Sequence, residues 1–210
     1  MIRLLTTSLL LMLTQVGQAS TQIGSVAIYS DGTVKKLLQN NEDWALWEDQ
    51  RKRQYKEAKY PHWPVLQYQK FPDIGDGYLQ ELVFGIPHRI KPIGDEASVT
   101  YELVKTSKGT TSKKYWRCSY DGQGSFKLGS KKYKTHNYDC ARFTLKKDIY
   151  PHRKEQLRIK YSPTLELVVD RKLVDSKGKT KRIKLVQLLP PEKVTAKRIA
   201  RTVYKLRNDN

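Results

Sequence analysis

The chain has 210 residues and carries 40 Lys or Arg against 21 Asp or Glu, which gives a formal net charge of +19 at pH 7. This length suits one large domain or two small ones, and the absence of internal repeats and low-complexity segments excludes a repeat architecture. With two cysteines, the chain can form at most one internal disulfide.

Residues 1–19 have the pattern of a secretory signal peptide. Arg3 precedes an apolar run from Leu4 to Val16, and small residues lead to a cleavage site between Ala19 and Ser20. The run is too short for a comfortable membrane span, although a retained anchor helix is the alternative. The first cysteine is Cys118, so we expect no lipid anchor. We predict a bacterial protein that is periplasmic or secreted and does not span a membrane after processing.

Residues 20–75 have the pattern of an N-terminal β-meander. Ile23 to Ile28 is short and mostly apolar, and Asp31-Gly32 is a hairpin turn signal. A second run begins at Val34 and ends at Asn40-Asn41. Two strands joined by a tight turn are therefore expected here.

The segment from Trp47 to Lys59 fits two structures. Trp44 and Trp47 are three residues apart, which suits a helix face, and Glu48 to Lys59 is rich in helix formers. We predict strand, as part of the meander, and keep helix as the open alternative. Tyr60 to Pro64 must be extended, because each proline disfavours helix at the preceding residue, and this segment ends the first unit.

A Gly- and Pro-rich region between residues 75 and 94 is the expected boundary between two units, and Phe71 to Tyr78 is expected to be a loop. Beyond it, residues 95–190 alternate cleanly between apolar and polar positions. This spacing predicts a mainly β fold, an antiparallel β-sandwich or small barrel with meander connections. The apolar positions are Val99, Tyr101 and Leu103, then Leu157, Ile159 and Tyr161 opposite Arg158 and Lys160, then Leu165, Leu167 and Val169, followed by a strand from Arg182 to Leu189.

Both cysteines lie in alternating runs between Trp116 and Phe143. Turn signals at Asp121-Gly122, Gly124 and Gly129-Ser130 predict a three-strand meander, which would bring Cys118 and Cys140 together. A disulfide would close a loop of about 23 residues and contribute roughly 3 kcal/mol in the loop-entropy model. Two buried free thiols are the alternative, which the predicted export disfavours.

Pro190-Pro191 ends the last strand, and residues 192–207 are predicted to form a short, basic, amphipathic C-terminal helix. Its apolar residues lie near one stripe while Lys and Arg cover the rest. The helix either covers the sheet with a solvated cationic face or contacts an anionic surface. The stripe consists of Val194, Ile199, Val203 and Leu206.

Nearly all of the positive charge lies in the second half. Residues 20–100 contain 10 basic and 11 acidic residues, whereas residues 101–210 contain 29 basic and 10 acidic. Such an excess attracts anionic partners, although it can also serve solubility alone. Export argues against chromosomal nucleic acid and favours anionic lipid head groups or envelope polymers. The candidate anion-binding residues are Lys127, Lys131, Lys132, Lys134, Lys181, Arg182, Lys184, Lys197, Arg198 and Arg201.

The sequence contains no catalytic motif that points to an enzyme. The four histidines have no metal-ligand spacing, so no metal site and no cofactor are predicted. Asp73 and Asp76 could bind calcium, but their run is too short for a calcium loop and is predicted to be a turn. A pair of carboxylates for glycoside hydrolysis stays a minor alternative, with Glu48, Asp49, Glu81 and Glu102 available.

A series of short motifs resembles uncharacterised exported bacterial proteins. They are Trp116-Arg117-Cys118, then Tyr133-Lys134-Thr135 leading to Cys140-Ala141-Arg142, then Tyr161-Ser162-Pro163-Thr164-Leu165 leading to Val168-Val169-Asp170-Arg171, with Trp47-Glu48 and the segment from Tyr60 to Leu66 in the first half. The resemblance implies a periplasmic β-rich fold and supplies no activity. Glu166 stands where that family tends to have glycine, which questions the tight turn there.

Together, these observations predict an exported, non-catalytic protein whose cationic second half contacts an anionic component of the cell envelope. A scaffolding role in an envelope protein complex is the alternative, using exposed aromatic residues such as Trp44, Trp47 and Trp63.

Overall fold

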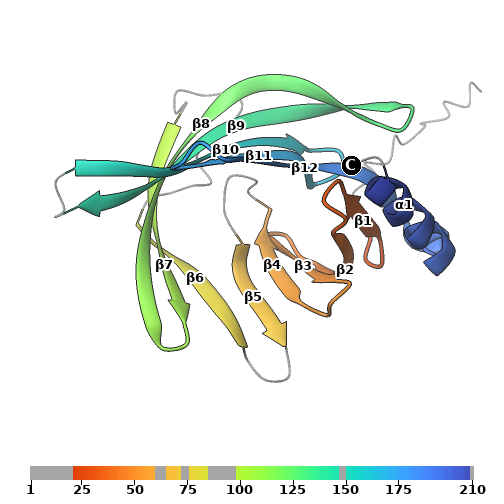
Figure 1. Cartoon of the computed structure of the whole chain (residues 1–210), viewed down its shortest axis with the longest axis horizontal. Helices are drawn as coiled ribbons and strands as arrows, with labels where there is room; N and C mark the ends of the chain where they lie inside the picture. Colours follow the sequence, from red (N-terminus) through yellow and green to blue (C-terminus); the bar gives the residue numbers. More distant parts are fainter. Residues whose placement is uncertain (1–20, 60–64, 72–75, 85–97, 147–149, 209–210) are drawn as a thin grey trace, which may run out of the picture.

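The computed structural model describes residues 21–59, 65–71, 76–84, 98–146 and 150–208. Within these ranges, twelve strands follow one another in chain order around one closed antiparallel β-barrel (Figure 1). This confirms the mainly β fold and decides between sandwich and barrel. The strands are β1 (Val26–Tyr29), β2 (Val34–Asn40), β3 (Trp44–Asp49), β4 (Gln54–Ala58), β5 (Val65–Phe71), β6 (Asp76–Phe84), β7 (Ser98–Ser107), β8 (Thr110–Leu128), β9 (Lys131–Lys146), β10 (Tyr150–Ser162), β11 (Leu167–Asp175) and β12 (Thr180–Leu189).

The barrel closes where β1 pairs with β2 on one side and with β12 on the other. The strands of the two predicted units are joined through β6 and β7, so residues 20–75 and 95–190 contribute to one sheet. Whether they act as separate domains stays a prediction. The predicted signal peptide at 1–19, the cleavage site at Ala19 and Ser20, and the extended segment at 60–64 lie outside the described residues.

The segment after Trp47 is strand, so the helical alternative is wrong. β3 and β4 form a hairpin in which Trp47 lies directly opposite Tyr55. A spacing of three places Trp44 and Trp47 on opposite faces of a strand. Trp47 is accordingly buried in the barrel, at 3% exposure, while Trp44 is half-buried with the Lys56 ammonium 4.2 Å from its ring centroid. Trp47 is therefore not an exposed contact residue, and Trp63 lies outside the described residues.

The loop predicted from Phe71 to Tyr78 is shorter than expected, because β5 ends at Phe71 and β6 begins at Asp76. Tyr78 pairs directly with Tyr68 across these two strands. The glycines that suggested a long loop include Gly77, where a Cβ would lie 1.8 Å from the Tyr68 carbonyl oxygen. Gly77 thus permits close strand pairing at this position.

The two cysteines are joined in the predicted disulfide, but the strands around them form one long hairpin and not a three-strand meander. Cys118 on β8 lies directly opposite Cys140 on β9. Asp121-Gly122 forms a β-bulge inside β8, because the pairing shifts between Tyr120 and Gln123, and Gly122 has a φ of 83°. The chain turns back only at Gly129-Ser130.

Beyond the bulge, β8 and β9 continue as a two-stranded ribbon. The last paired residues of β7 and β10 reach Ser119 and His136, so the ribbon extends past both neighbouring strands. Figure 1 shows it arching over β10, β11 and β12. Its apolar side chains, Phe126, Leu128 and Tyr133, pack against a core cluster formed by Ala27, Leu37, Trp47, Leu165, Leu167, Val169 and Leu185.

A second cluster fills the barrel under β7 to β10 and surrounds the disulfide. It contains predicted apolar residues of β7 and β10. It also contains the side chains of β8 and β9 that lie on the same face of the sheet as the cysteines. Its buried members are Val99, Tyr101, Leu103, Trp116, Cys118, Tyr138, Cys140 and Ile159.

The C-terminal helix covers the outer face of β1 and β12. The predicted stripe of Val194, Ile199, Val203 and Leu206 packs against Val26, Ile28 and Leu189. The helix α1 (Ala196–Asn208) begins later than the predicted residue 192, because Pro191–Lys193 form a 3-10 turn instead. The Thr195 hydroxyl accepts a hydrogen bond from the Arg198 backbone N–H, so Thr195 acts as the N-cap.

Candidate functional site

Two groups of charged side chains stand out, one on the outside of the barrel and one inside it. The outer group lies on β10, β11 and β12, where Arg158, Lys172 and Arg182 occupy directly opposed positions. In the next row, Lys160 and Lys184 lie on either side of Asp170. We call Arg158, Lys160, Lys172, Arg182 and Lys184 the outer cationic face.

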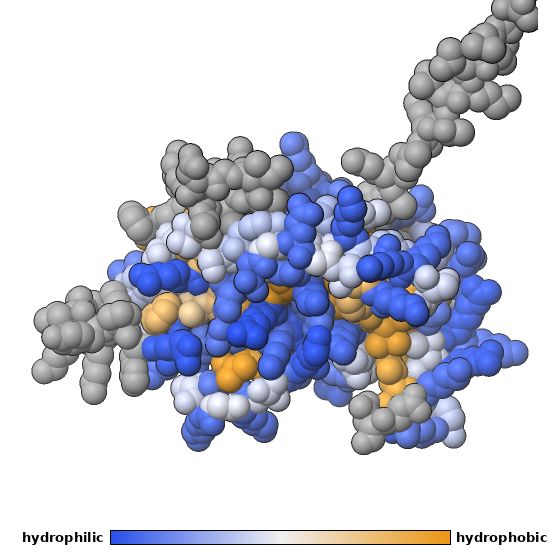
Figure 2. All heavy atoms as spheres, turned by 90° about the horizontal axis from the view of Figure 1, so that it is seen from above, coloured by the Kyte–Doolittle hydropathy of each residue, from blue (hydrophilic) through white to orange (hydrophobic). Residues whose placement is uncertain are grey.

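The sequence pattern explains why these side chains point outward. Leu157, Ile159 and Tyr161 belong to or pack against the core cluster around the disulfide, so Arg158 and Lys160 between them face the opposite side of the sheet. The strand register then places the cations of three strands side by side. Arg158, Lys160, Lys172 and Arg182 line a surface groove of about 400 Å³. The face of the molecule seen in Figure 2 is mostly hydrophilic.

The charge on this face is only partly compensated. Arg158 lies 3.4 Å from Asp139, and the Arg182 guanidinium donates two hydrogen bonds to Asp170. Lys160, Lys172 and Lys184 form no ion pair with any described residue. Five cations therefore face three carboxylates, Asp139, Asp170 and Asp121, the last of which lines the same groove. Like charges at directly opposed strand positions repel one another, and in the row of Arg158, Lys172 and Arg182 only the two arginines have a carboxylate partner among the described residues.

The ribbon carries a second set of exposed cations. Lys127 lies directly opposite Lys132, and Lys134 lies opposite Ser125. These three lysines are exposed and form no ion pair with the part of the chain that the structure describes. They share one face of the ribbon, on the side away from Phe126 and Tyr133.

The structure separates the predicted anion-binding residues into several places. Arg182 and Lys184 belong to the outer cationic face, whereas Lys181 lies on the other side of β12 and approaches Asp31 at 3.8 Å. Lys131 lies opposite Leu128, on the opposite ribbon face from Lys132. Lys197, Arg198 and Arg201 are exposed on α1.

Sequence reasoning missed Arg158, Lys160 and Lys172 as site residues. The alternation on β10 showed that Arg158 and Lys160 share a face, but alternation within one strand does not give its register against the next. The like-charged row across three strands depends on that register.

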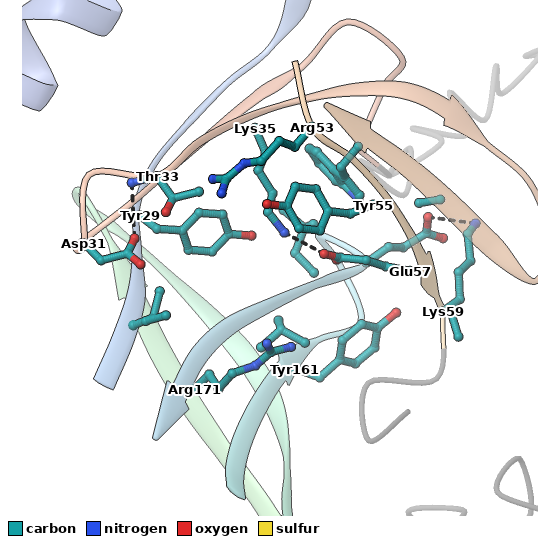
Figure 3. A pocket seen from close by; sticks show the side chains of 17 residues that line it. Tyr29, Asp31, Thr33, Lys35, Arg53, Tyr55, Glu57, Lys59, Tyr161 and Arg171 are labelled. Atoms are coloured by element: carbon teal, nitrogen blue, oxygen red, sulfur yellow. Dashed lines mark hydrogen bonds and ion pairs between the residues drawn. The ribbon is translucent and has the colours of Figure 1, made fainter. Parts of the chain in front are cut away.

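The inner group surrounds a pocket of about 190 Å³ inside the barrel, which we call the interior pocket. It is lined from one side by β1 to β4 and from the other by β10 to β12 (Figure 3). Its apolar wall includes Ala45, Trp47, Leu167 and Ile183. Its polar side chains are Tyr29, Asp31, Thr33, Lys35, Arg53, Tyr55, Glu57, Lys59, Tyr161, Glu166 and Arg171.

Most charges of the interior pocket are paired. Lys35 lies 2.6 Å from Glu57, and Lys59 lies 3.2 Å from Glu166. Arg53 binds Asp49, which lies just outside the lining. Burial by itself would raise the pKa of Glu57, but the charge and hydrogen bond of Lys35, with a smaller effect of Arg171, lower it below the usual range.

Asp49 is the most heavily hydrogen-bonded carboxylate of this region. It accepts hydrogen bonds from the backbone N–H groups of Arg51 and Arg53, from the Arg53 side chain and from the Tyr55 hydroxyl. Burial favours its neutral form, but these donors and the charge of Arg53 outweigh burial and lower the pKa of Asp49.

Three tyrosines of the interior pocket keep their protons at neutral pH. Burial, and next the charge of Glu57, raises the pKa of Tyr29; burial, and next Asp49, raises that of Tyr55. Burial and the charge of Glu166 raise the pKa of Tyr161. All three hydroxyls therefore remain hydrogen-bond donors; that of Tyr55 already donates to Asp49, whereas those of Tyr29 and Tyr161 have no acceptor among the described residues.

A ladder of tyrosines continues the inner wall from the pocket along β4, β5 and β6. The Tyr55 and Tyr68 ring centroids are 5.2 Å apart, and those of Tyr68 and Tyr78 are 5.4 Å apart. A lysine ammonium lies over each end, with Lys35 4.5 Å from the Tyr55 centroid and Lys105 4.0 Å from the Tyr78 centroid. The inner wall thus pairs cations with aromatic rings.

Neither group forms a recognisable metal or hydrolase centre. Among the described residues, no cluster of three or more His, Cys, Asp or Glu side chains could hold a metal ion. The carboxylates named for glycoside hydrolysis are otherwise engaged or exposed, since Glu48, Asp49 and Glu102 form ion pairs and Glu81 lies on the surface. In the described part of the chain, no helix has the length and apolar character to cross a membrane.

No protein-family model matches the chain, and no curated protein sequence matches it. Among solved structures, it is similar to the hypothetical lipoprotein YmcC from Escherichia coli, with 9% sequence identity and a TM-score of 0.47 over 78% of this chain and 82% of that one. It is also similar to a protein with a YmcC-like fold from Bacteroides fragilis, with 10% identity and a TM-score of 0.41 over 80% of this chain and 97% of that one. At these identities and TM-scores, neither likeness assigns a family or a function.

Proposed function

We propose that this chain is an exported, non-catalytic protein that contacts an anionic component of the cell envelope, lipid head groups or an envelope polymer, through the outer cationic face. The observation that carries this proposal is the row of Arg158, Lys172 and Arg182 at directly opposed positions on three strands. Phosphate or carboxylate groups lying against this row would reduce the repulsion between its like charges and would give Lys172 an anionic partner.

Export is supported by two features of the chain. The apolar run before Ala19 has the pattern of a signal peptide, and the Cys118–Cys140 disulfide is typical of an oxidising compartment. The ribbon lysines Lys127, Lys132 and Lys134 would add to the positive potential that attracts an anionic surface.

The experiment compares two triple variants that remove the same charge. Lys160→Gln, Lys172→Gln and Lys184→Gln together neutralise lysines of the outer cationic face that have no ion pair with a described residue. The matched control, Lys36→Gln, Lys193→Gln and Lys205→Gln, neutralises three exposed lysines elsewhere on the surface that also have no ion pair with a described residue. Binding is measured to phosphatidylglycerol vesicles, to neutral phosphatidylcholine vesicles and to lipopolysaccharide.

The proposal predicts that the first variant binds the anionic probes at least about tenfold more weakly than wild type, since each neutralised surface contact contributes roughly 0.5–1 kcal/mol. The control variant should lose clearly less. Equal losses in both variants would mean that only the net charge matters, and the outer cationic face would then not be a site.

A further inference from the structure

The interior pocket contains one cation more than its carboxylate partners can neutralise. Each carboxylate in its lining has a cationic partner, because Glu57 pairs with Lys35, Glu166 with Lys59, and Asp31 with Lys181. Arg53 is neutralised by Asp49. This leaves the Arg171 guanidinium, whose Nε is buried and has no hydrogen-bond partner among the described residues.

An unpaired buried guanidinium N–H is unusual, because a buried polar group without a partner costs stability. Arg171 is not within ion-pair distance of Glu57, although its charge reaches Glu57 and Tyr29. Arg171 lines the interior pocket together with the Tyr29 and Tyr161 side chains (Figure 3). A ligand here would find a bidentate cationic donor and two neutral hydroxyl donors.

Farther along the inner wall, two further cations lack a carboxylate partner within the described part of the chain. Lys105 lies over the Tyr78 ring, and Lys114 contacts the Gln80 side chain at 3.4 Å. Burial, and next the charges of Lys105 and Arg142, lowers the pKa of Lys114. The interior of the barrel therefore has a positive potential that favours an anion over a neutral or cationic guest.

The size and walls of the pocket limit the guest. A protein cavity of about 150 Å³ binds benzene, so about 190 Å³ holds a single ring with one small substituent. The Trp47, Tyr55, Leu167 and Ile183 side chains provide an apolar and aromatic wall for such a ring. One unpaired guanidinium matches one negative charge.

We infer that the interior pocket binds a small organic monocarboxylate with one ring-sized apolar body, its carboxylate on Arg171 and its ring against the Trp47 side of the pocket. A backbone feature at the rim agrees with this inference. Glu166, which lines the pocket and pairs with Lys59, has a φ of 52°, and such strained non-glycine residues concentrate at ligand sites. The inference is independent of the outer cationic face.

Benzoate is the probe, and benzamide is its uncharged control of the same shape. Both are titrated into the wild-type protein and followed by NMR chemical-shift changes at pocket residues. The same titrations are made on Arg171→Gln and on Arg158→Gln, which removes an arginine charge from the outer surface.

Benzoate should shift the resonances of Tyr29, Tyr161 and Arg171 and should bind about 10- to 100-fold more tightly than benzamide, as expected for a charge-assisted hydrogen-bonded pair. Arg171→Gln should abolish this preference, and Arg158→Gln should keep it. If benzoate and benzamide bind wild type equally, or neither shifts the pocket resonances, the inference is overturned. The comparison of the two probes on wild type decides this even if Arg171→Gln does not fold.

Discussion

The outer cationic face and the interior pocket use the same residue types in opposite ways. Outside, five cations face three carboxylates, and three lysines lack an ion pair with any described residue. Inside, each lining carboxylate has its own cation, and one arginine remains. The difference follows from exposure to solvent. Water and salt screen exposed charges, whereas a buried charge without a partner lowers the free energy of unfolding by several kcal/mol. An uncompensated charge is therefore more informative inside the barrel than outside it.

The largest difference should appear when a carboxylate is removed from each region. Asp49→Ala deprives the Arg53 side chain, the Tyr55 hydroxyl and two backbone N–H groups of their acceptor, so we expect a loss of about 3–4 kcal/mol in the free energy of unfolding. Asp139→Ala, which removes the partner of Arg158 from the outer surface, should cost about 1 kcal/mol or less. Urea denaturation measures both, and similar losses would contradict the comparison.

A smaller difference is expected between two lysine ion pairs. In the interior, Lys35 and Glu57 are 17% and 30% exposed, whereas Lys52, which pairs with Glu48, is 80% exposed. Lys35→Met should cost about 2–3 kcal/mol because it leaves Glu57 without its partner. Lys52→Met should change stability by about 0.5 kcal/mol or less.

The Lys35–Glu57 pair also makes the free energy of unfolding depend on pH, in a direction that follows from the pKa of Glu57. The pKa of Glu57 is lowered in the folded protein, so its stabilising effect is fully present above the ordinary pKa of about 4.5 and is lost as pH falls through the lower folded value. The stability difference between wild type and Lys35→Met should therefore shrink below about pH 4.5. If the stability difference between wild type and Lys35→Met instead grew on acidification, the ion pair would not lower the pKa of Glu57 and the prediction would be wrong.

The smallest effect is expected at Glu166, where a substitution has two opposing effects on stability. Glu166→Gly relieves a left-handed backbone conformation that costs about 1 kcal/mol or more, but it also removes the ion pair with Lys59. We expect the net stability change to stay within about 1 kcal/mol. Thermal unfolding measures it, and Glu166→Asn, which tolerates positive φ, is the control that keeps a side chain.

The motif resemblance left the turn at Glu166 in question, and the structure answers it. The turn forms between β10 and β11 with Glu166 itself in the left-handed region, so glycine is not required there. The strand pattern around Cys118 and Cys140 likewise predicted the disulfide, because alternation places both residues on the buried side of their strands.

The interior pocket could not be predicted from the sequence. Tyr29, Glu57 and Arg171 come from β1, β4 and β11, and only closure of the barrel between β1 and β12 brings them together. The turn predicted at Asp121-Gly122 was wrong for a related reason, since a bulge and a tight turn can both place a glycine at positive φ and only the partner strand distinguishes them. In both cases the missing information is register between strands, which local patterns do not contain.

The salt dependence of binding tests most directly whether the two regions hold separate ligands. The affinity of wild-type protein for phosphatidylglycerol vesicles and for benzoate would be measured between about 50 and 500 mM salt, a range over which the screening length falls severalfold. We predict that vesicle binding weakens at least about tenfold, because the outer cationic face meets solvent, while benzoate binding changes by less than about twofold, because the Arg171 Nε is buried in the interior pocket. A parallel loss of both affinities would contradict the account, since it would mean that benzoate binds surface cations and not the interior pocket.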